Sequence, residues 1–269
     1  YHKSPQGLST AYDILCGLIS ALMISKKFKV DIIHARSYVP SIIALCLQKI
    51  LGIQYVFDMR GFWVDERVDG GLWRKDSYLY MISKWFESKF LLNANHTISL
   101  THAAVREINK FPYLLTNPPR ISVIPTCTDL SRFQPLNPKS SAKIFFFTLG
   151  YIGSIGTWYN FDLVADVFKQ LLILQPNSKL LIVNQNQHES IRDILRQKNL
   201  PSDSIEIIAA KHSDIPAIIN TMSAGIFFIK PLFSKQASAP TKLGEFLACG
   251  KPCLSNRGVG DMTSILHGE

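Results

Sequence analysis

The sequence is short of cysteine and of acidic side chains, and it has no long apolar run. Five cysteines occur in 269 residues, an odd number, and none lies in a Cys-x-x-Cys or zinc-type spacing. This pattern excludes a small disulfide scaffold and predicts reduced cysteines in a cytosolic protein.

The best candidate for a membrane span is residues 14–24, an eleven-residue stretch followed by Lys26, Lys27 and Lys29. It is too short, because a spanning helix needs about 20 apolar residues. The stretch is either a buried helix or a helix on a membrane surface with its lysines at the headgroups. The sequence opens on Tyr1 without an initiator Met or signal peptide and closes on Glu269, so we expect a fragment cut at both ends.

The composition is that of a folded, basic protein. Hydrophobic residues make up 47% of the sequence, which excludes a disordered chain. The 29 basic residues exceed the 20 acidic ones and give a net charge of +9. Residues 1–138 hold 16 basic and 10 acidic residues, a net +6, so this half is the predicted docking face for an anionic partner. There is no run of Lys and Arg, and no nucleic-acid partner is predicted.

Short apolar runs alternate with amphipathic segments, as is typical of parallel βαβ units. The predicted strands are 30–36, 54–60, 96–100, 121–125, 145–153, 179–183, 205–209, 224–230 and 252–255. The predicted helices are 41–51, 73–92, 103–109, 161–174, 190–198, 214–222 and 241–248. The alternation stops at QPLNPKSSAK, residues 134–143, whose prolines and serines are typical of a linker. The sequence therefore predicts an α/β protein with two domains, residues 1–138 and 139–269.

The richest candidate site is SAPTKLGEFLACGKP, residues 238–252. Pro240 favours the first turn of a helix, and Ser238 is the predicted N-cap. Such a helix start offers free N–H groups and a positive dipole end to an anion, and Lys242 adds a full charge. Glu245, one turn further on, could accept two hydrogen bonds from a ribose diol. The alternative is an ordinary capped helix with a solvated Glu245.

Polar side chains also end the first two predicted strands. His34 and Arg36 end one strand, and Asp58 and Arg60 end the next, at the edge where open α/β sheets bind ligands. Asp58 could polarise an acceptor hydroxyl or contact a donor sugar. Alternatively, Asp58 and Arg60 form a buried pair that holds the loop.

The segment GFWVDERVDGGLW, residues 61–73, is predicted to be a long aromatic loop. It could be a lid or acceptor site in which Trp63 and Trp73 stack on a sugar or touch lipid, or a surface loop with buried aromatics. Its carboxylates do not form an Asp-x-Asp motif, and no metal is predicted.

Four segments resemble glycosyltransferase family 4 (group 1), which has the GT-B fold. They are residues 31–36, 123–133, 147–156 and 238–252, and they follow the order and spacing of the family. The resemblance covers nearly the whole chain. It implies two facing Rossmann-like domains with parallel sheets, the first on the acceptor side and the second binding a nucleotide sugar.

The resemblance also implies a reaction: transfer of a sugar from a nucleotide diphosphate sugar with retention of configuration, without metal or cofactor. Glu245 matches the last residue of the family's Glu-x7-Glu motif, where it is expected to bind the ribose. The expected donor-binding residues are Gly153, Ser154, Gly156, Ser238, Pro240, Thr241, Lys242 and Glu245. The expected catalytic residues are Asp58, Arg60, His34 and Arg36.

The sequence departs from the family pattern at three places. Ala237 stands where the motif has its first Glu, and Asp58 where many members have a His. Ser154, with Trp158 or Tyr159, stands where an Arg and a Lys clamp the diphosphate. If the site is active, positive charge for the leaving group must come from elsewhere.

Lys242 is the first choice for that charge, followed by Arg60 and Arg36. We expect a glycosyltransferase that acts on a glycan or lipid-linked acceptor in polysaccharide or lipopolysaccharide synthesis. It is expected in the cytoplasm, with an anionic membrane surface as a further partner at the inner face of the cell membrane. The rivals are a sugar-nucleotide 2-epimerase, which shares the fold, and a degenerate member that acts as a scaffold.

Overall fold

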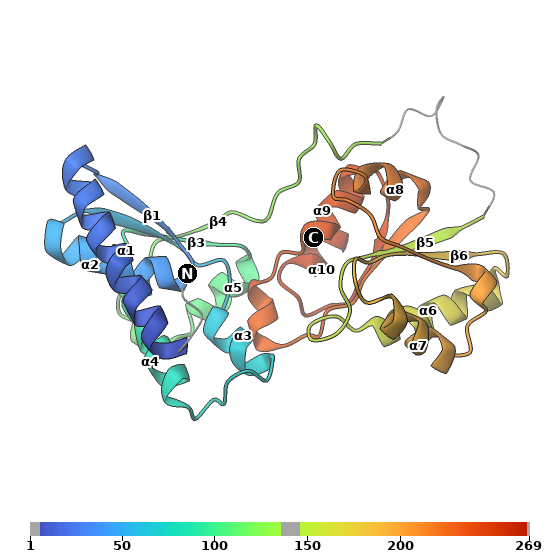
Figure 1. The fold of residues 1–269 in the computed structure, drawn as a ribbon, viewed down its shortest axis with the longest axis horizontal. Coiled ribbons are helices and arrows are strands. Elements are labelled where there is room, and N and C mark those ends of the chain that lie inside the picture. Colours follow the sequence, from blue (N-terminus) through green and yellow to red (C-terminus); the bar gives the residue numbers. More distant parts are fainter. Residues whose placement is uncertain (1–5, 136–145, 268–269) are drawn as a thin grey trace. The chain divides into compact units, whose positions relative to one another are not determined.

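The computed structural model describes residues 6–135 and 146–267 of the chain (Figure 1). The predicted domain boundary between residues 138 and 139 lies outside the described residues. The chain forms two compact units. Unit 1 comprises Tyr1–Pro125 and Leu232–Ser238, and unit 2 comprises Thr126–Pro231 and Ala239–Glu269.

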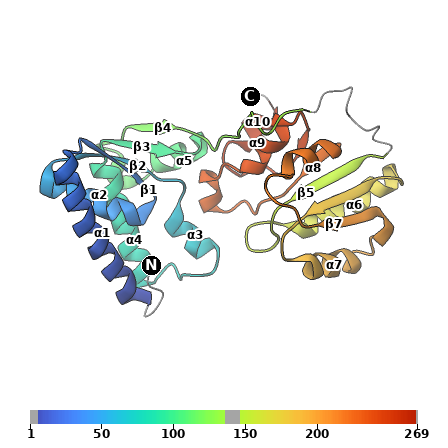
Figure 2. The same cartoon turned by 45° about the horizontal axis from the view of Figure 1, so that its top comes forward.

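Unit 1 is a four-stranded parallel sheet in the order β1-β2-β3-β4. Its strands are β1 (Ile32–Arg36), β2 (Gln54–Asp58), β3 (His96–Ser99) and β4 (Ile121–Val123). Its helices are α1 (Gln6–Phe28), α2 (Tyr38–Leu51), α3 (Trp63–Asp69), α4 (Tyr78–Asn93), α5 (His102–Ile108) and the 3-10 turn η1 (Pro112–Leu114). Helix α1 packs on α2 and α2 on α4, and the three lie along one face of the sheet (Figure 2).

The unit 1 core forms where alternate strand residues meet α4. Tyr55 and Phe57 of β2 are fully buried, and the Phe57 ring lies 5.3 Å from that of Phe90. Local signals set the bounds of the helices around this core. Helix α2 ends at Gly52, which lies in the left-handed region with φ 72°, a conformation that glycine adopts without strain. Helix α4 begins where the Ser77 side chain accepts a hydrogen bond from the Tyr80 amide.

Three expectations for unit 1 need correction. Residues 61–73 are not a loop throughout, because α3 occupies most of this segment. The helix predicted from residue 73 begins at Tyr78, after the Ser77 cap. Helix α1 is longer than the predicted apolar stretch and is not buried all round, since Leu15, Ile19 and Met23 are exposed. No helix within residues 6–135 and 146–267 is both long and apolar enough to cross a bilayer.

Unit 2 is a five-stranded parallel sheet in the order β7-β6-β5-β8-β9. Its strands are β5 (Thr148–Ile152), β6 (Lys179–Val183), β7 (Ile205–Ile208), β8 (Ala224–Ile226) and β9 (Cys253–Leu254). Its helices are α6 (Phe161–Leu174), α7 (His188–Gln197), α8 (Ile215–Thr221), α9 (Thr241–Ala248), α10 (Met262–His267) and the turn η2 (Ser202–Ser204).

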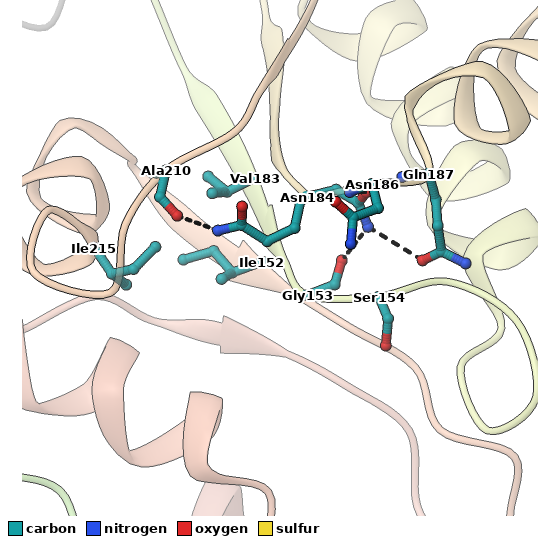
Figure 3. A pocket seen from close by; sticks show the side chains of 10 residues that line it. Ile152, Gly153, Ser154, Val183, Asn184, Asn186, Gln187, Ala210 and Ile215 are labelled. Atoms are coloured by element: carbon teal, nitrogen blue, oxygen red, sulfur yellow. Dashed lines mark hydrogen bonds between the residues drawn. The ribbon is translucent and has the colours of Figure 1, made fainter.

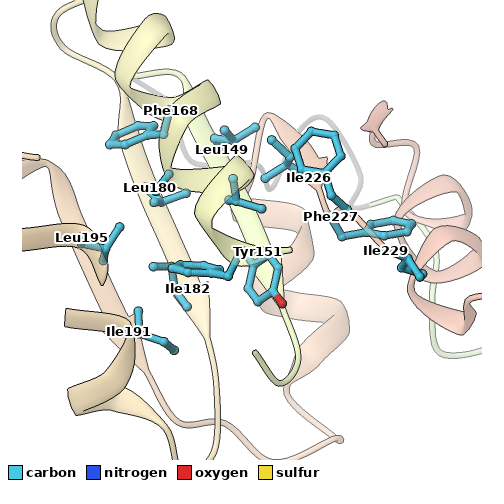
Figure 4. Packing of buried hydrophobic residues seen from close by; sticks show 14 of the residues in the cluster. Leu149, Tyr151, Phe168, Leu180, Ile182, Ile191, Leu195, Ile226, Phe227 and Ile229 are labelled. Atoms are coloured by element: carbon cyan, nitrogen blue, oxygen red, sulfur yellow. The ribbon is translucent and has the colours of Figure 1, made fainter. Parts of the chain in front are cut away.

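Both faces of the unit 2 sheet are buried, as expected for a parallel sheet covered by helices. Tyr151 and Phe168 belong to the cluster shown in Figure 4. Gly150 and Gly225 are register neighbours on β5 and β8. A Cβ at Gly150 would overlap the Met222 sulfur, and one at Gly225 would lie 2.7 Å from the Phe246 ring. Gly150 thus makes room for Met222, which follows α8, and Gly225 lets Phe246 of α9 pack closely on the strands.

Residues 126–135 pack within unit 2, where Phe133 is buried in the same cluster as Phe246. In the other direction, Leu232–Ser238 leaves unit 2 and joins unit 1. This segment contains the 3-10 turn η3 (Phe233–Ala237), and Ala237 is buried in the unit 1 core. The chain thus passes from unit 2 to unit 1 and back immediately before α9.

Candidate functional site

A cavity of about 420 Å³ opens at the carboxyl ends of β5 and β6 in unit 2 (Figure 3). This edge of an open parallel sheet is where α/β proteins commonly bind ligands. The lining residues are Ile152, Gly153, Ser154, Val183, Asn184, Gln185, Asn186, Gln187, Ala210 and Ile215. Two of the residues predicted to bind a donor, Gly153 and Ser154, therefore line this cavity.

Carboxamide side chains fix one wall of the cavity. The Asn184 amide donates to the Gly153 carbonyl at 2.9 Å, and its oxygen accepts from the Gln187 backbone N–H at 2.6 Å. The Gln187 side chain in turn accepts from the Ile155 N–H at 2.8 Å and donates to its carbonyl at 3.1 Å. The loop that follows β5 is therefore held by side chains from the end of β6.

Two polar groups of the same wall remain available to a ligand. Gln185 donates its amide to the Ala210 carbonyl, which leaves its side-chain oxygen without a partner among the described residues. The Asn186 carboxamide makes no hydrogen bond to the described part of the chain. Sequence analysis missed these residues, although four consecutive amides at the end of a buried strand are a usable signal.

Lys242, in the first turn of α9, lies against the loop that follows β5. Its Nζ is buried and has no hydrogen-bond partner in the described residues. The ammonium sits 3.9 Å from the centre of the Tyr159 ring and 5.3 Å from that of Tyr151. A Cβ at Gly153 would lie 2.9 Å from Nζ, so this cation can approach the loop because position 153 is glycine. Burial lowers the pKa of Lys242 to about 7, and the charge of Glu245 opposes the shift.

Helix α9 carries the rest of the predicted donor motif. Its N-cap is Pro240, without a side-chain cap, so the prediction that Ser238 caps the helix is wrong. Ser238 instead belongs to unit 1, and its N–H donates to the Lys235 carbonyl. Pro240 and Thr241 begin the helix, which leaves the first-turn amides free of a side-chain cap.

Glu245 is buried on α9, and burial raises its pKa against the opposing charges of His212, Lys242 and Arg132. The alternative of a solvated Glu245 is therefore wrong.

Gly156 has φ 95° and forms an isolated bridge with Tyr159, the residue whose ring lies over Lys242. The glycine loop and α9 thus meet around one buried cation.

In unit 1, the ends of β1 and β2 bring three of the predicted catalytic residues together. Arg36 and Asp58 are register neighbours. Asp58 Oδ2 lies 3.4 Å from His34 Nε2 and 3.8 Å from Arg36 Nε. The Asp58 side chain is 15% exposed, whereas those of His34 and Arg36 are 59% and 67% exposed. The carboxylate is therefore shielded, and its basic neighbours face solvent.

Arg60 is not part of this cluster. It is exposed, and the alternative of a buried Asp58–Arg60 pair is wrong because Asp58 pairs with His34 and Arg36. Arg60 has φ 58° and Ser37 has φ 75°, so two non-glycine residues in the left-handed half of the φ range follow β2 and β1. Such backbone costs about 1–3 kcal/mol per residue and concentrates at functional sites. Sequence analysis did not detect the strain at Ser37.

Two units, each with a parallel sheet, match the GT-B fold of solved glycosyltransferase structures. Residues 5–132 match the model of Glycosyltransferase Family 4. This matched part of the chain is similar to glycosyltransferase family 4, the family that the sequence motifs resemble.

Two curated relatives and one solved structure illustrate the similarity. The phosphatidylinositol N-acetylglucosaminyltransferase gpi3 subunit of Schizosaccharomyces pombe is 26% identical over 66% of this chain and 37% of its own length. The Escherichia coli UDP-Gal:α-D-GlcNAc-diphosphoundecaprenol α-1,3-galactosyltransferase is 25% identical over 88% of this chain and 60% of its own. HepE from Anabaena, solved with UDP and glucose, superposes with a TM-score of 0.63 at 13% identity, over 90% of this chain and 63% of its own. The chain thus spans less than two thirds of each relative.

Proposed function

We propose that the chain is part of a glycosyltransferase that binds a nucleotide diphosphate sugar in unit 2. The observation that carries this proposal is the buried ammonium of Lys242, which has no hydrogen-bond partner in the described chain and lies against the glycine of a loop that lines a cavity. A buried cation without a partner is costly, and an anionic ligand would offset that cost. The UDP in the HepE structure is a ligand of this class.

In this proposal the nucleoside occupies the cavity and contacts the free groups of Gln185 and Asn186. The diphosphate lies across the Gly153–Gly156 loop and is held by Lys242 and the first-turn amides of α9. Glu245 accepts hydrogen bonds from the ribose. Negative charge grows on the diphosphate as it leaves, so Lys242 stabilises the transition state more than the ground state.

Unit 1 supplies the acceptor side in the same proposal. Asp58 lies in a shielded position between His34 and Arg36, which suits it to orient an acceptor hydroxyl. Both curated relatives have names that specify a lipid-linked acceptor, phosphatidylinositol in one and diphosphoundecaprenol in the other. We therefore propose a glycan or lipid-linked acceptor in cell-envelope synthesis. Retention of configuration and independence from metals follow from the family resemblance.

Exposed apolar side chains on unit 1 support a location next to a lipid surface. Met23 on α1 and Trp85 on α4 are more than half exposed, and Lys26, Lys27 and Lys89 lie close to them in the sequence. Such helices can lie in the headgroup region of an anionic membrane. We propose a peripheral protein at the inner face of the cell membrane.

Binding of UDP, GDP, ADP and CMP tests the donor site, with Lys242→Met and Glu245→Ala as site variants and Lys230→Met as an exposed control. We expect one nucleoside diphosphate to bind the parent protein and Lys230→Met equally. Either site variant is expected to weaken binding by about tenfold or more. Binding that survives both site variants contradicts the donor site. Acceptor-free conversion of a nucleotide sugar indicates the 2-epimerase instead.

The scaffold alternative has one observation in its favour. Ala237 stands where the family motif has a Glu, and it is buried in the unit 1 core, where it contributes no polar group to a donor sugar. A chain that binds no nucleoside diphosphate at millimolar concentration supports the scaffold.

A further inference from the structure

Three aromatic rings of unit 2 lie close to the Lys242 ammonium. Its Nζ is 3.9 Å from the centre of the Tyr159 ring, 5.3 Å from that of Tyr151 and 5.4 Å from that of Phe227. A ring face attracts a cation within about 6 Å of its centre, most strongly where water is excluded. Because Nζ has no hydrogen-bond partner among the described residues, ring faces take the place of hydrogen bonds at this cation.

The three rings have different surroundings. Tyr151 and Phe227 are fully buried in the unit 2 core (Figure 4), and the Tyr151 hydroxyl donates to the Ser154 carbonyl at 2.6 Å. Tyr159 packs against the same cluster but is only half-buried. Burial alone raises the pKa of Tyr159, and its hydroxyl makes no hydrogen bond within the part of the chain that the structure describes. Tyr159 is thus the nearest of the three to the cation, and it is the ring that makes the contact.

Backbone contacts fix Tyr159 independently of Lys242. Its N–H donates to the Gly156 carbonyl at 2.7 Å, and isolated bridges pair it with Gly156 and with Ile229. The positive φ of Gly156, 95°, closes this turn. The ring is therefore held by a turn and by the chain that continues β8, so it can act as a fixed support for a flexible side chain.

Lys242 meets the same loop at its first residue, since a Cβ at Gly153 would lie 2.9 Å from Nζ. A lysine side chain has many rotamers, and most of them would carry the charge away from this position. A cation that a ring already keeps in place binds an anion without losing that freedom. An ammonium has three N–H donors, so it can contact a ring face and phosphate oxygens at once.

The charge of Lys242 also depends on its titratable neighbours, which are Glu245 on α9, Cys253 on β9 and the two tyrosines. The charge of Glu245 favours the ammonium, whereas burial disfavours it and brings the pKa of Lys242 to about 7. Burial raises the pKa of the Cys253 thiol to about 12, so this group stays neutral near pH 7. Loss of the Tyr159 ring face would lower the pKa of Lys242 further, because a ring attracts the ammonium more than the neutral amine.

We propose that Tyr159 is a positioning residue for the donor diphosphate: its ring holds the Lys242 ammonium, in its charged form, against the loop at Gly153. The inference rests on the proposed function, in which Lys242 binds that diphosphate. Tyr159 acts through the lysine and not through a contact of its own with the donor.

Nuclear magnetic resonance of isotope-labelled lysine in the free protein tests the ring contact. The Lys242 signal is identified by its absence in Lys242→Met. We expect its titration midpoint to fall by about one pH unit in Tyr159→Leu and to stay unchanged in Tyr159→Phe, which keeps the ring. Phe147→Leu, which removes a partly buried ring from the same core, is the control and should leave the midpoint in place. Replacing Tyr159 by a fluorinated phenylalanine weakens the ring face at nearly the same shape, so it tests the contact if the leucine variant does not fold.

Binding of UDP, GDP and ADP at pH 7.5 tests the consequence. For the nucleoside diphosphate that the parent protein prefers, we expect Tyr159→Leu to raise the Kd about tenfold and Tyr159→Phe to raise it less than about twofold. In a Lys242→Met background the leucine substitution should change the Kd no further, because the ring acts only through that lysine.

Four results would overturn the inference: an unchanged midpoint or an unchanged Kd in Tyr159→Leu, an equal loss in Tyr159→Phe, or a loss that persists without Lys242. A parent protein that binds none of the three nucleotides at millimolar concentration overturns the proposed function instead. The titration midpoint then reports the ring contact alone and separates the two failures.

Discussion

The Nζ of Lys242 lies 3.9 Å from the centre of the Tyr159 ring and has no hydrogen-bond partner within the described residues. An aromatic face attracts a cation, whereas burial disfavours its charged form. The effect of burial is the larger of the two, and it lowers the pKa of Lys242 to about 7. This lysine can therefore change its charge near neutral pH.

Donor binding should weaken as the pH rises above about 7. The folded protein carries a neutral Lys242 above that pH, and a diphosphate requires the ammonium, so binding must take up a proton. We expect the Kd for the preferred nucleoside diphosphate to rise by up to about tenfold per pH unit between pH 7.5 and 9. Calorimetric measurement of this Kd across the pH range checks the prediction. A Kd that stays flat, or that shows the same slope in Lys242→Met, would contradict the role of this lysine.

Lys242→Met should stabilise the unliganded protein, and more so at low pH. The pKa of Lys242 is lowered on folding from 10.5 to about 7, so the unfolded chain binds more protons between these values. The penalty is complete below pH 7 and fades as the pH rises towards 10.5. We expect a gain of about 1–3 kcal/mol in the free energy of unfolding at pH 6 that shrinks by pH 10. Denaturant titrations measure this, and Lys230→Met, an exposed lysine, should show neither effect.

Gly153→Ala should reduce donor binding more than Gly156→Ala. Both glycines have positive φ, 123° and 95°, so each substitution strains the backbone by about 1–3 kcal/mol. Only a Cβ at position 153 meets Lys242, while position 156 is open. We expect the nucleotide Kd to rise about tenfold or more for Gly153→Ala and less than about threefold for Gly156→Ala. Equal losses would mean that strain alone is responsible.

Asp58→Asn should slow transfer without weakening the donor complex. The substitution keeps the shape of the side chain but removes the charge that faces His34 and Arg36. If Asp58 orients the acceptor hydroxyl, kcat should fall about 100-fold while the Kd for the nucleotide stays within about twofold. Asp31→Asn, an exposed carboxyl just before β1, is the matched control. A parallel loss of nucleotide affinity would assign Asp58 to the donor.

Local pattern predicted most elements. The helices at 161–174 and 241–248 and the strand at 179–183 have the bounds that the sequence predicted. The tandem βαβ pattern and the four family motifs led to the GT-B fold, which is confirmed, and to family 4, whose model matches residues 5–132. Periodicity is a local property, and these elements are long or apolar enough to show it.

The same approach missed α3, whose seven residues are too short and too charged to show a helical period. It also failed at Ser238, because this residue ends η3 and the N-cap of α9 is Pro240. No pattern in the sequence indicated that the segment 232–238 packs with residues 61–101. The roles of the predicted site residues remain predictions, although the structure gathers His34, Arg36 and Asp58 at one edge and Gly153 and Lys242 at another.

The sequence by itself determined the α/β class, the parallel strands, the family resemblance and the types of residue available at each strand end. Each of these follows from spacing along the chain, since residues in one strand or helix share its geometry wherever the element lies. Only the tertiary structure decided that Lys242 is buried without a hydrogen-bond partner among the described residues and that Glu66 reaches Lys235, 169 residues away. Burial and long-range pairing depend on which elements pack together, and the packing is set by the whole chain at once.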